Sequence, residues 1–187
     1  VSLRALPTPI AVEFKVIASA PGSAGSSKLP LPPAVSSTTP EVVTGNTSII
    51  DVSQAPKPVG AYPHARVFGD LLFLSGIGSR TPGTNEIPGG PIRDANKNPL
   101  PYDIKAQTRQ VIENIRTILS GCGASLDDII DVQVFLVDMD RDFAGFNAVY
   151  GEYFKDIRAT RTTVSLRALP TPIAVEFKVI ASAPGTK

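Results

Sequence analysis

The stretch IKAQTRQVIENIRTILSGCGASLDDIIDVQVFLVD (residues 104–138) decides the fold, because a helix and a buried strand follow one another in it. Apolar side chains recur at helical spacing within residues 104–123 and would form one stripe: Val111, Ile112, Ile115, Ile118 and Leu119. Asp103 is the expected N-cap, and one of the two glycines near the far end is the expected stop. The run 129–138 has little polar interruption, which predicts a strand inside a sheet.

The segments on either side complete the pattern. Residues 143–157 predict a second helix, with Asp140 or Asp142 as its cap. Its aromatic side chains would lie largely on one side: Phe143, Phe146, Tyr150, Tyr153 and Phe154. Upstream, RVFGDLLFLSGIG (66–78) predicts a hairpin that turns at Gly69-Asp70.

A repeat divides the chain, since VSLRALPTPIAVEFKVIASAPG occurs at residues 1–22 and again, letter for letter, at 164–185. The segment predicts two strands separated by Leu-Pro-Thr-Pro, because proline removes a ladder donor. Identity without drift favours a recent duplication or an engineered sequence. Only one copy can fill a given place in one subunit. The other would stay outside the sheet, occupy a neighbour's site or compete for the same place.

The remaining segments are less regular. Residues 23–58 predict a Pro/Ser-rich linker and N-terminal extension, with a short strand at 46–52 and compact folding only from residue 59. Residues 79–103 are dense in Gly, Pro and Asn, which predicts either a surface flap or a lid over a site. The expected order, strand–strand–helix–strand–helix–strand–strand, predicts an α+β fold with two helices on one face of a mixed sheet. The other face would then need a partner, and a homo-oligomer is the economical answer.

Composition excludes several classes of function. The formal net charge is +1, which gives no electrostatic reason to expect nucleic acid or an anionic membrane as partner. The single cysteine, Cys122, excludes an intrachain disulfide, and the single histidine, His64, excludes a His-rich metal site. No apolar run approaches the roughly 20 residues that span a bilayer. We therefore expect a soluble cytoplasmic protein without metal.

Five motifs, in order along the chain, resemble those of the RidA/YjgF family. They are VGAYPHARVFGDLLFLSG (59–76), AQTRQVIENIRTIL (106–119), DFAGFNAVYGEYF (142–154), ATRTTV (159–164) and LPTPIAVEFKVIA (169–181). The finer resemblance is to the 2-aminomuconate deaminase-like branch. It rests on AYPHAR, on the long insertion at residues 79–103 and on ATRTTV. The family resemblance assigns residues 59–187 to a deaminase domain.

The resemblance implies a chorismate-mutase-like fold, assembled as a homotrimer with sites between subunits. It implies hydrolysis of a small enamine or imine carboxylate, similar to 2-aminomuconate or 2-aminoacrylate, to a 2-oxo acid and ammonia, without any cofactor. One alternative is a non-catalytic trimeric scaffold or metabolite-binding protein, including an engineered sequence that folds in alternate frames. Another is a ribonuclease or translation inhibitor, which the near-neutral charge argues against.

The resemblance also implies two catalytic residues. Arg161 falls where the family keeps the arginine that binds the substrate carboxylate, and a guanidinium can hold a carboxylate with two parallel hydrogen bonds. Glu176 falls where the family has a glutamate that would orient water and pass a proton to the departing amine. The alternative to this catalytic role is that Glu176 is an exposed strand residue paired with Lys178 or Arg167. Glu13 is its copy in the repeated segment.

Other matched positions would bind the substrate. These are Tyr62, His64, Ser75, Gly76, Asn147 and Thr163. His64 could instead have a purely structural role. Asn147 could instead make an ordinary hydrogen bond on the surface of its helix. Thr163 stands where many family members have a cysteine, so thiol chemistry is excluded there. For a substrate with a second carboxylate, Arg80 and Arg93 are candidate anchors by position alone.

Overall fold

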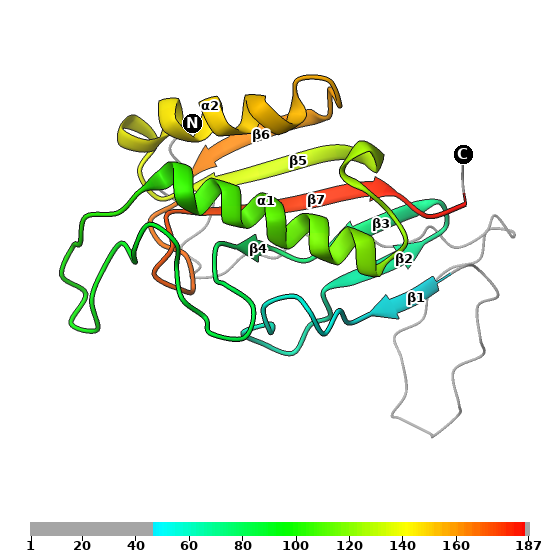
Figure 1. Cartoon of the computed structure of the whole chain (residues 1–187), viewed down its shortest axis with the longest axis horizontal. Coiled ribbons are helices and arrows are strands. Elements are labelled where there is room, and N and C mark those ends of the chain that lie inside the picture. The colour runs from blue at the N-terminus through cyan, green and yellow to red at the C-terminus, as the bar shows by residue number, and fades with distance from the viewer. Residues whose placement is uncertain (1–46, 186–187) are drawn as a thin grey trace, which may run out of the picture. The chain divides into compact units, whose positions relative to one another are not determined.

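The computed structural model describes residues 47–185 of the chain (Figure 1). The first copy of the repeat, with Glu13, and the linker up to residue 46 lie outside the described residues. The second copy, at residues 164–185, lies within them, and its strands are the ones described below.

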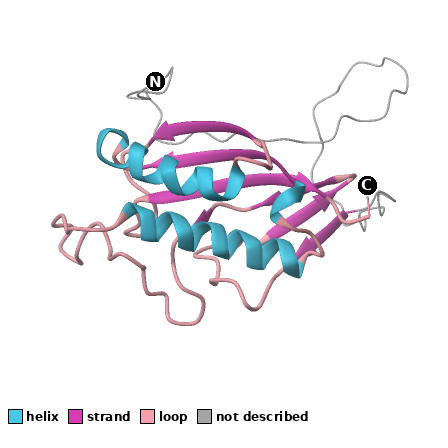
Figure 2. Cartoon of the chain, turned by 45° about the horizontal axis from the view of Figure 1, so that its top comes forward, coloured by secondary structure: helices cyan, strands magenta, loops and turns pink. Residues whose placement is uncertain are grey.

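Seven strands and two α-helices make up the described part. The elements are β1 (Thr47–Ile50), β2 (Ala65–Phe68), β3 (Leu71–Leu74), β4 (Ile77–Gly78), α1 (Ile104–Gly121), the 3-10 helix η1 (Leu126–Asp128), β5 (Ile129–Leu136), α2 (Met139–Phe154), β6 (Thr160–Ser165) and β7 (Val175–Ser182). The strands form one sheet in the order β1-β2-β3-β7-β5-β6, and β4 also pairs with β7. Only β5 and β6 pair in parallel; the other pairs are antiparallel. Both helices lie on one face of this sheet (Figure 2), which confirms the predicted mixed α+β fold.

The core lies between the helices and the sheet. Side chains alternate along strand β7, with Val175, Phe177 and Val179 fully buried toward the helices. Phe146 of α2 meets Phe177 edge-on, with 5.9 Å between ring centroids, a geometry that aromatic pairs favour. The predicted apolar stripe of α1 is also buried.

The helix boundaries follow from their caps. Asp103 caps α1 as predicted, since its carboxylate accepts from the backbone N–H groups of Lys105 and Ala106. Gly123 follows this helix with φ of 78°, a conformation that favours glycine. The predicted cap of α2 is wrong. The cap is Asp138, which accepts from the backbone N–H of Arg141, so the helix begins at Met139.

The expected start of the compact fold needs correction, and the last two strands are arranged differently from a hairpin. Compact structure begins before residue 59, because β1 pairs with β2 and both Val52 and Ala55 lie in the core. The last two strands of the chain, β6 and β7, are not neighbours, because β5 lies between them. The predicted short strand near residue 46 and the hairpin through Gly69-Asp70 are confirmed.

Two buried amides of α1 hold the loop 79–103. Gln107 accepts from the Ser79 hydroxyl and donates to the carbonyl of Gly90. Asn114 donates to the carbonyls of Gly78 and Arg80. Both side chains are buried, so each bond is made away from water. The loop 79–103 is therefore attached to α1 at its start and near its middle.

Candidate active site

Arg161 lies on β6, on the face of the sheet that the helices cover. It pairs in register with Val132 of β5, whose side chain is buried under the helices. Its guanidinium donates to the Asn147 side-chain oxygen of α2 at 2.9 Å and stands 4.5 Å from the centre of the Tyr150 ring. Within residues 47–185 no carboxylate oxygen lies within 4.0 Å of it. The structure thus brings Arg161 and Asn147 together and leaves the guanidinium free to bind an anion.

Two hydroxyl groups on the same face lack partners. Thr163, two residues along β6, and Tyr150 each have a buried hydroxyl without a hydrogen-bond partner among the described residues. A buried polar group without a partner costs about 1–3 kcal/mol, so such groups call for an explanation. The sequence predicts Tyr150 only as a core aromatic; its unpaired hydroxyl becomes visible only in the structure.

Glu176 lies on the opposite face. It pairs in register with Phe135 of β5 and with Gly78 of β4, and its side chain points away from the helices. Burial raises the pKa of the Glu176 carboxyl, and the nearby charge of Lys178 opposes that rise in part. No ammonium or guanidinium nitrogen of the described residues lies within 4.0 Å of its carboxylate. The expected alternative, an ordinary surface pair with Lys178 or Arg167, is therefore not formed.

Glu176 lines a pocket together with three of the residues matched from the family. Tyr62, Ser75 and Gly76 all contribute to it. A Cβ at position 76 would collide with the Glu176 carboxylate, so glycine is needed there for the acid to lie close to the backbone. The Ser75 hydroxyl donates to the carbonyl of Pro63 at 2.6 Å, and the Tyr62 hydroxyl accepts from the backbone N–H of Val59. These contacts hold the segment before β2 against the end of β3.

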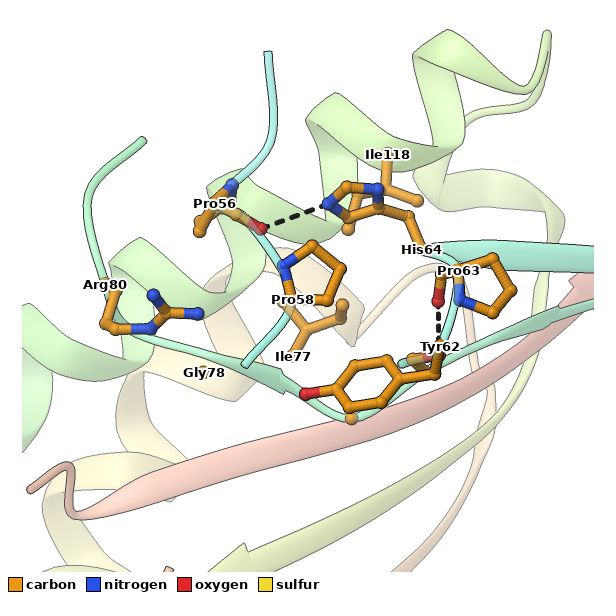
Figure 3. Close-up of a pocket in the computed structure, with 11 residues that line it drawn as sticks. Pro56, Pro58, Tyr62, Pro63, His64, Ile77, Gly78, Arg80 and Ile118 are labelled. Carbon is orange, nitrogen blue, oxygen red and sulfur yellow. Dashed lines mark hydrogen bonds between the residues drawn. The ribbon is translucent and has the colours of Figure 1, made fainter. Parts of the chain in front are cut away.

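His64 lines a neighbouring pocket and bonds to backbone carbonyl and amide groups (Figure 3). Its Nδ1 accepts from the N–H of Val52 at 3.1 Å, and its Nε2 lies 3.0 Å from the carbonyl of Pro56, to which it donates. The ring is 7% exposed. Because both nitrogens are engaged, the geometry favours the structural alternative for His64, and its contact with a substrate stays a prediction.

The two arginines considered for a second carboxylate differ. Arg80 lines the Glu176 pocket, whereas Arg93 donates to the carbonyl of Leu169 at 3.0 Å and braces the loop before β7. Lys178, which the sequence suggests only as a pairing partner, also lines the pocket. Its position two residues after Glu176 on a strand is the available signal, because such residues share a face.

The candidate residues thus form two sets in one chain. Arg161, Asn147 and Thr163 belong to the helix-covered face near the β6 edge. Tyr62, Ser75, Gly76 and Glu176 belong to the opposite face. Arg161 and Glu176 are on strands separated only by β5, but their side chains leave the sheet in opposite directions.

The described part limits other chemistry. Within residues 47–185 there is no group of three or more His, Cys, Asp or Glu side chains that could hold a metal ion. No helix in that part is long and apolar enough to cross a membrane. Fold and site together define an α+β protein that has, in its described part, an arginine without an ion pair and a half-buried glutamate on opposite faces of a mixed sheet.

Comparison with known proteins identifies the family. The profile of the family described as Endoribonuclease L-PSP matches residues 52–183. A RutC family protein of Pyrococcus horikoshii is 42% identical over 133 residues, which cover 71% of this chain and 95% of that protein. The Escherichia coli protein named "Putative reactive intermediate deaminase TdcF" is 33% identical over 136 residues, 71% of this chain and 95% of that protein.

Solved structures agree. The crystal structure of E. coli TdcF with bound serine has a TM-score of 0.60 at 33% identity and covers 72% of this chain and 98% of that one. The crystal structure of the E. coli YjgF gene product has a TM-score of 0.61 at 29% identity, with the same coverage. The chain belongs to this family, the RidA/YjgF or RutC family, which includes proteins named as reactive intermediate deaminases.

Proposed function

We propose that this protein is a cofactor-independent deaminase of small enamine or imine carboxylates, active as a homotrimer with each site shared by two protomers. The observation that carries the proposal is the separation of Arg161 and Glu176 on opposite faces of one sheet. In one protomer they cannot act on the same small molecule. If the edge at β6 of one protomer meets the helix-free face of another, both sets of residues line one cleft.

The helix-free face suits such a contact. Phe73, Phe135 and Ile180 are half-buried on it, and Leu71 is 37% exposed. Burying apolar area contributes roughly 25 cal/mol per Å², so a closed assembly would gain by covering them.

The chemistry follows from these groups. An enamine tautomerises to the imine, water adds to the imine carbon, and ammonia leaves to give a 2-oxo acid. Arg161, held by Asn147 and the Tyr150 ring, would bind the carboxylate beside the reacting carbon. Glu176 would take a proton from the attacking water and return it to the departing nitrogen. Burial raises the pKa of Glu176, which moves this carboxyl toward the range in which an acid both accepts and donates.

A 2-aminomuconate-like or 2-aminoacrylate-like compound is the proposed substrate class. The descriptive name of the family suggests a ribonuclease instead. The net charge of +1 offers little for an RNA backbone, whose binding depends on several basic contacts.

Hybrid trimers test the shared site directly. Arg161→Ala and Glu176→Gln should each be inactive in ammonia release from a freshly generated imine. After the two variants are unfolded together and reassembled, about a quarter of the sites should hold one intact Arg161 and one intact Glu176 from different protomers. About a quarter of the wild-type rate should then return. No recovery in mixed trimers of correct mass would show that both residues come from one protomer.

The wild-type assay tests the activity itself. A trimer of correct mass that does not accelerate ammonia release above the spontaneous rate would contradict the proposed function.

A further inference from the structure

The pocket that Glu176 lines contains two cations that form no ion pair with the described residues. Lys178 and Arg80 both line it, and within residues 47–185 neither has a carboxylate oxygen within 4.0 Å. The Lys178 ammonium is half-buried and donates one hydrogen bond, to the carbonyl of Leu74 at 3.0 Å. An ammonium has three donors, so two remain for a ligand.

Arg80 is fixed in place rather than paired. Its two terminal nitrogens donate to the side chain of Asn85 and to the carbonyl of Lys57, each at 2.7 Å. Both acceptors are neutral, so they orient the guanidinium and leave its charge uncompensated. Figure 3 shows the neighbouring pocket, which shares Arg80 and Tyr62 with the pocket that Glu176 lines.

The charges at this point favour an anion. Partly desolvated charges are costly unless they are paired, and here two cations face a single carboxylate. The carboxylate, Glu176, lies beyond ion-pair distance of both. Arg161 of a neighbouring protomer would add a third cation. A substrate with one carboxylate would leave the site positive, whereas a dicarboxylate would balance it.

We propose that Lys178, supported by Arg80, is a second anion-binding subsite that selects substrates with a carboxylate at both ends. The identity of the first anchor, Arg161, rests on the proposed function. The subsite itself is built from residues on one face of one protomer and can be tested by binding alone. Arg93, which bonds to backbone carbonyls before β7, takes no part.

Stable product-like acids provide the probe. 2-Oxoadipate and 2-oxohexanoate have the same six-carbon chain and differ in a terminal carboxylate or methyl group. By calorimetry, the wild-type trimer should bind the dicarboxylate at least about tenfold more tightly, as expected for one charge-assisted hydrogen bond. Lys178→Met should abolish that preference and leave the monocarboxylate affinity within about twofold. Lys178→Arg should keep most of it.

The exposed Lys155, which follows α2, provides the matched control, and Lys155→Met should bind both acids as the wild type does. Mass and circular dichroism establish that each variant is assembled. Equal binding of the two acids by the wild type, no binding of the dicarboxylate, or an unchanged preference in Lys178→Met would overturn the inference.

Ammonia release separates the two proposals. If the wild type deaminates a monocarboxylate imine but shows no dicarboxylate preference, the proposed function stands and the subsite is refuted. If the preference depends on Lys178 while no imine is deaminated, the subsite is supported and the proposed function falls.

Discussion

The two faces of the sheet carry different kinds of functional group. On the helix-covered face, the Arg161 guanidinium is held by one amide and two aromatic rings. On the helix-free face, Glu176 lies in a pocket that raises its pKa, so its protonation can change during a reaction. Under the proposed function, one face would offer an anchor for the carboxylate and the other a proton-transfer group. This difference between the two faces fits the proposed deamination of an imine.

The largest effect should come from removing the anchor. Arg161→Ala should lower kcat/KM for an imine carboxylate by about 100-fold or more, because a desolvated charge-assisted contact contributes roughly 1.5–3 kcal/mol or more when bidentate. Arg161→Lys should restore only part of this, since an ammonium lacks the planar fork. The exposed pair Arg116–Glu113 on α1 gives the control, and Arg116→Ala should leave the rate unchanged. Full activity in Arg161→Ala would show that the helix-covered face does not hold the anchor.

A smaller effect should follow from crowding the acid. Gly76→Ala places a methyl group against the Glu176 carboxylate and should displace it, lowering kcat by about tenfold, which is less than the roughly 100-fold that a 1 Å misplacement can cost. Gly151→Ala in α2 is the matched control, because a Cβ there meets nothing within 4 Å. It should raise stability by up to about 1 kcal/mol through helix propensity, with no change in rate. Equal rates in the two variants would show that the position of Glu176 is unimportant.

The smallest effect concerns an unpaired hydroxyl. Thr163→Val removes a buried hydroxyl without a partner in the described residues and should raise stability by about 1 kcal/mol, or about 2–4 °C in Tm. Thr108→Val is the contrast, since that buried hydroxyl donates to the carbonyl of Ile104 at 2.8 Å and its loss should lower Tm. Destabilisation by Thr163→Val, measured on the assembled protein, would mean that another protomer supplies the missing partner.

The elements with strong periodicity were predictable from the sequence. The stripe of α1, its Asp103 cap and the alternation of β7 all follow from residue spacing. The cap of α2 did not, because Asp138, Asp140 and Asp142 are the same residue type at alternate positions and only backbone geometry separates them. The two-residue strand β4 could not be predicted for a related reason, since two residues carry no period.

The candidate site was predictable as a set of residues but not as an arrangement. Whether Arg161 and Glu176 share a face depends on the register of two strand pairs, β5 with β6 and β5 with β7. The alternation of β7 puts Glu176 opposite the buried side chains of that strand. Strand β6 has no clear apolar alternation, and a shift of β6 by one residue would turn Arg161 to the other face. Lys178 does not stand out as a ligand-binding residue, because in the sequence it resembles the usual solvated partner of a glutamate. Its missing ion pair becomes evident only from distances.

The place of β7 in the sheet also sets the order in which the protein can form. The last strand of the chain lies between β3 and β5, so the earlier strands can build only two separate pieces until it arrives. The edges of both pieces at β3 and β5 stay unpaired until β7 joins them. That pairing closes large loops, and closing large loops is the slow step in sheets of high contact order. During synthesis, the sheet and the Glu176 pocket are therefore completed in one late event. The sequence of that closing strand also stands at residues 1–22, ahead of every strand that it joins.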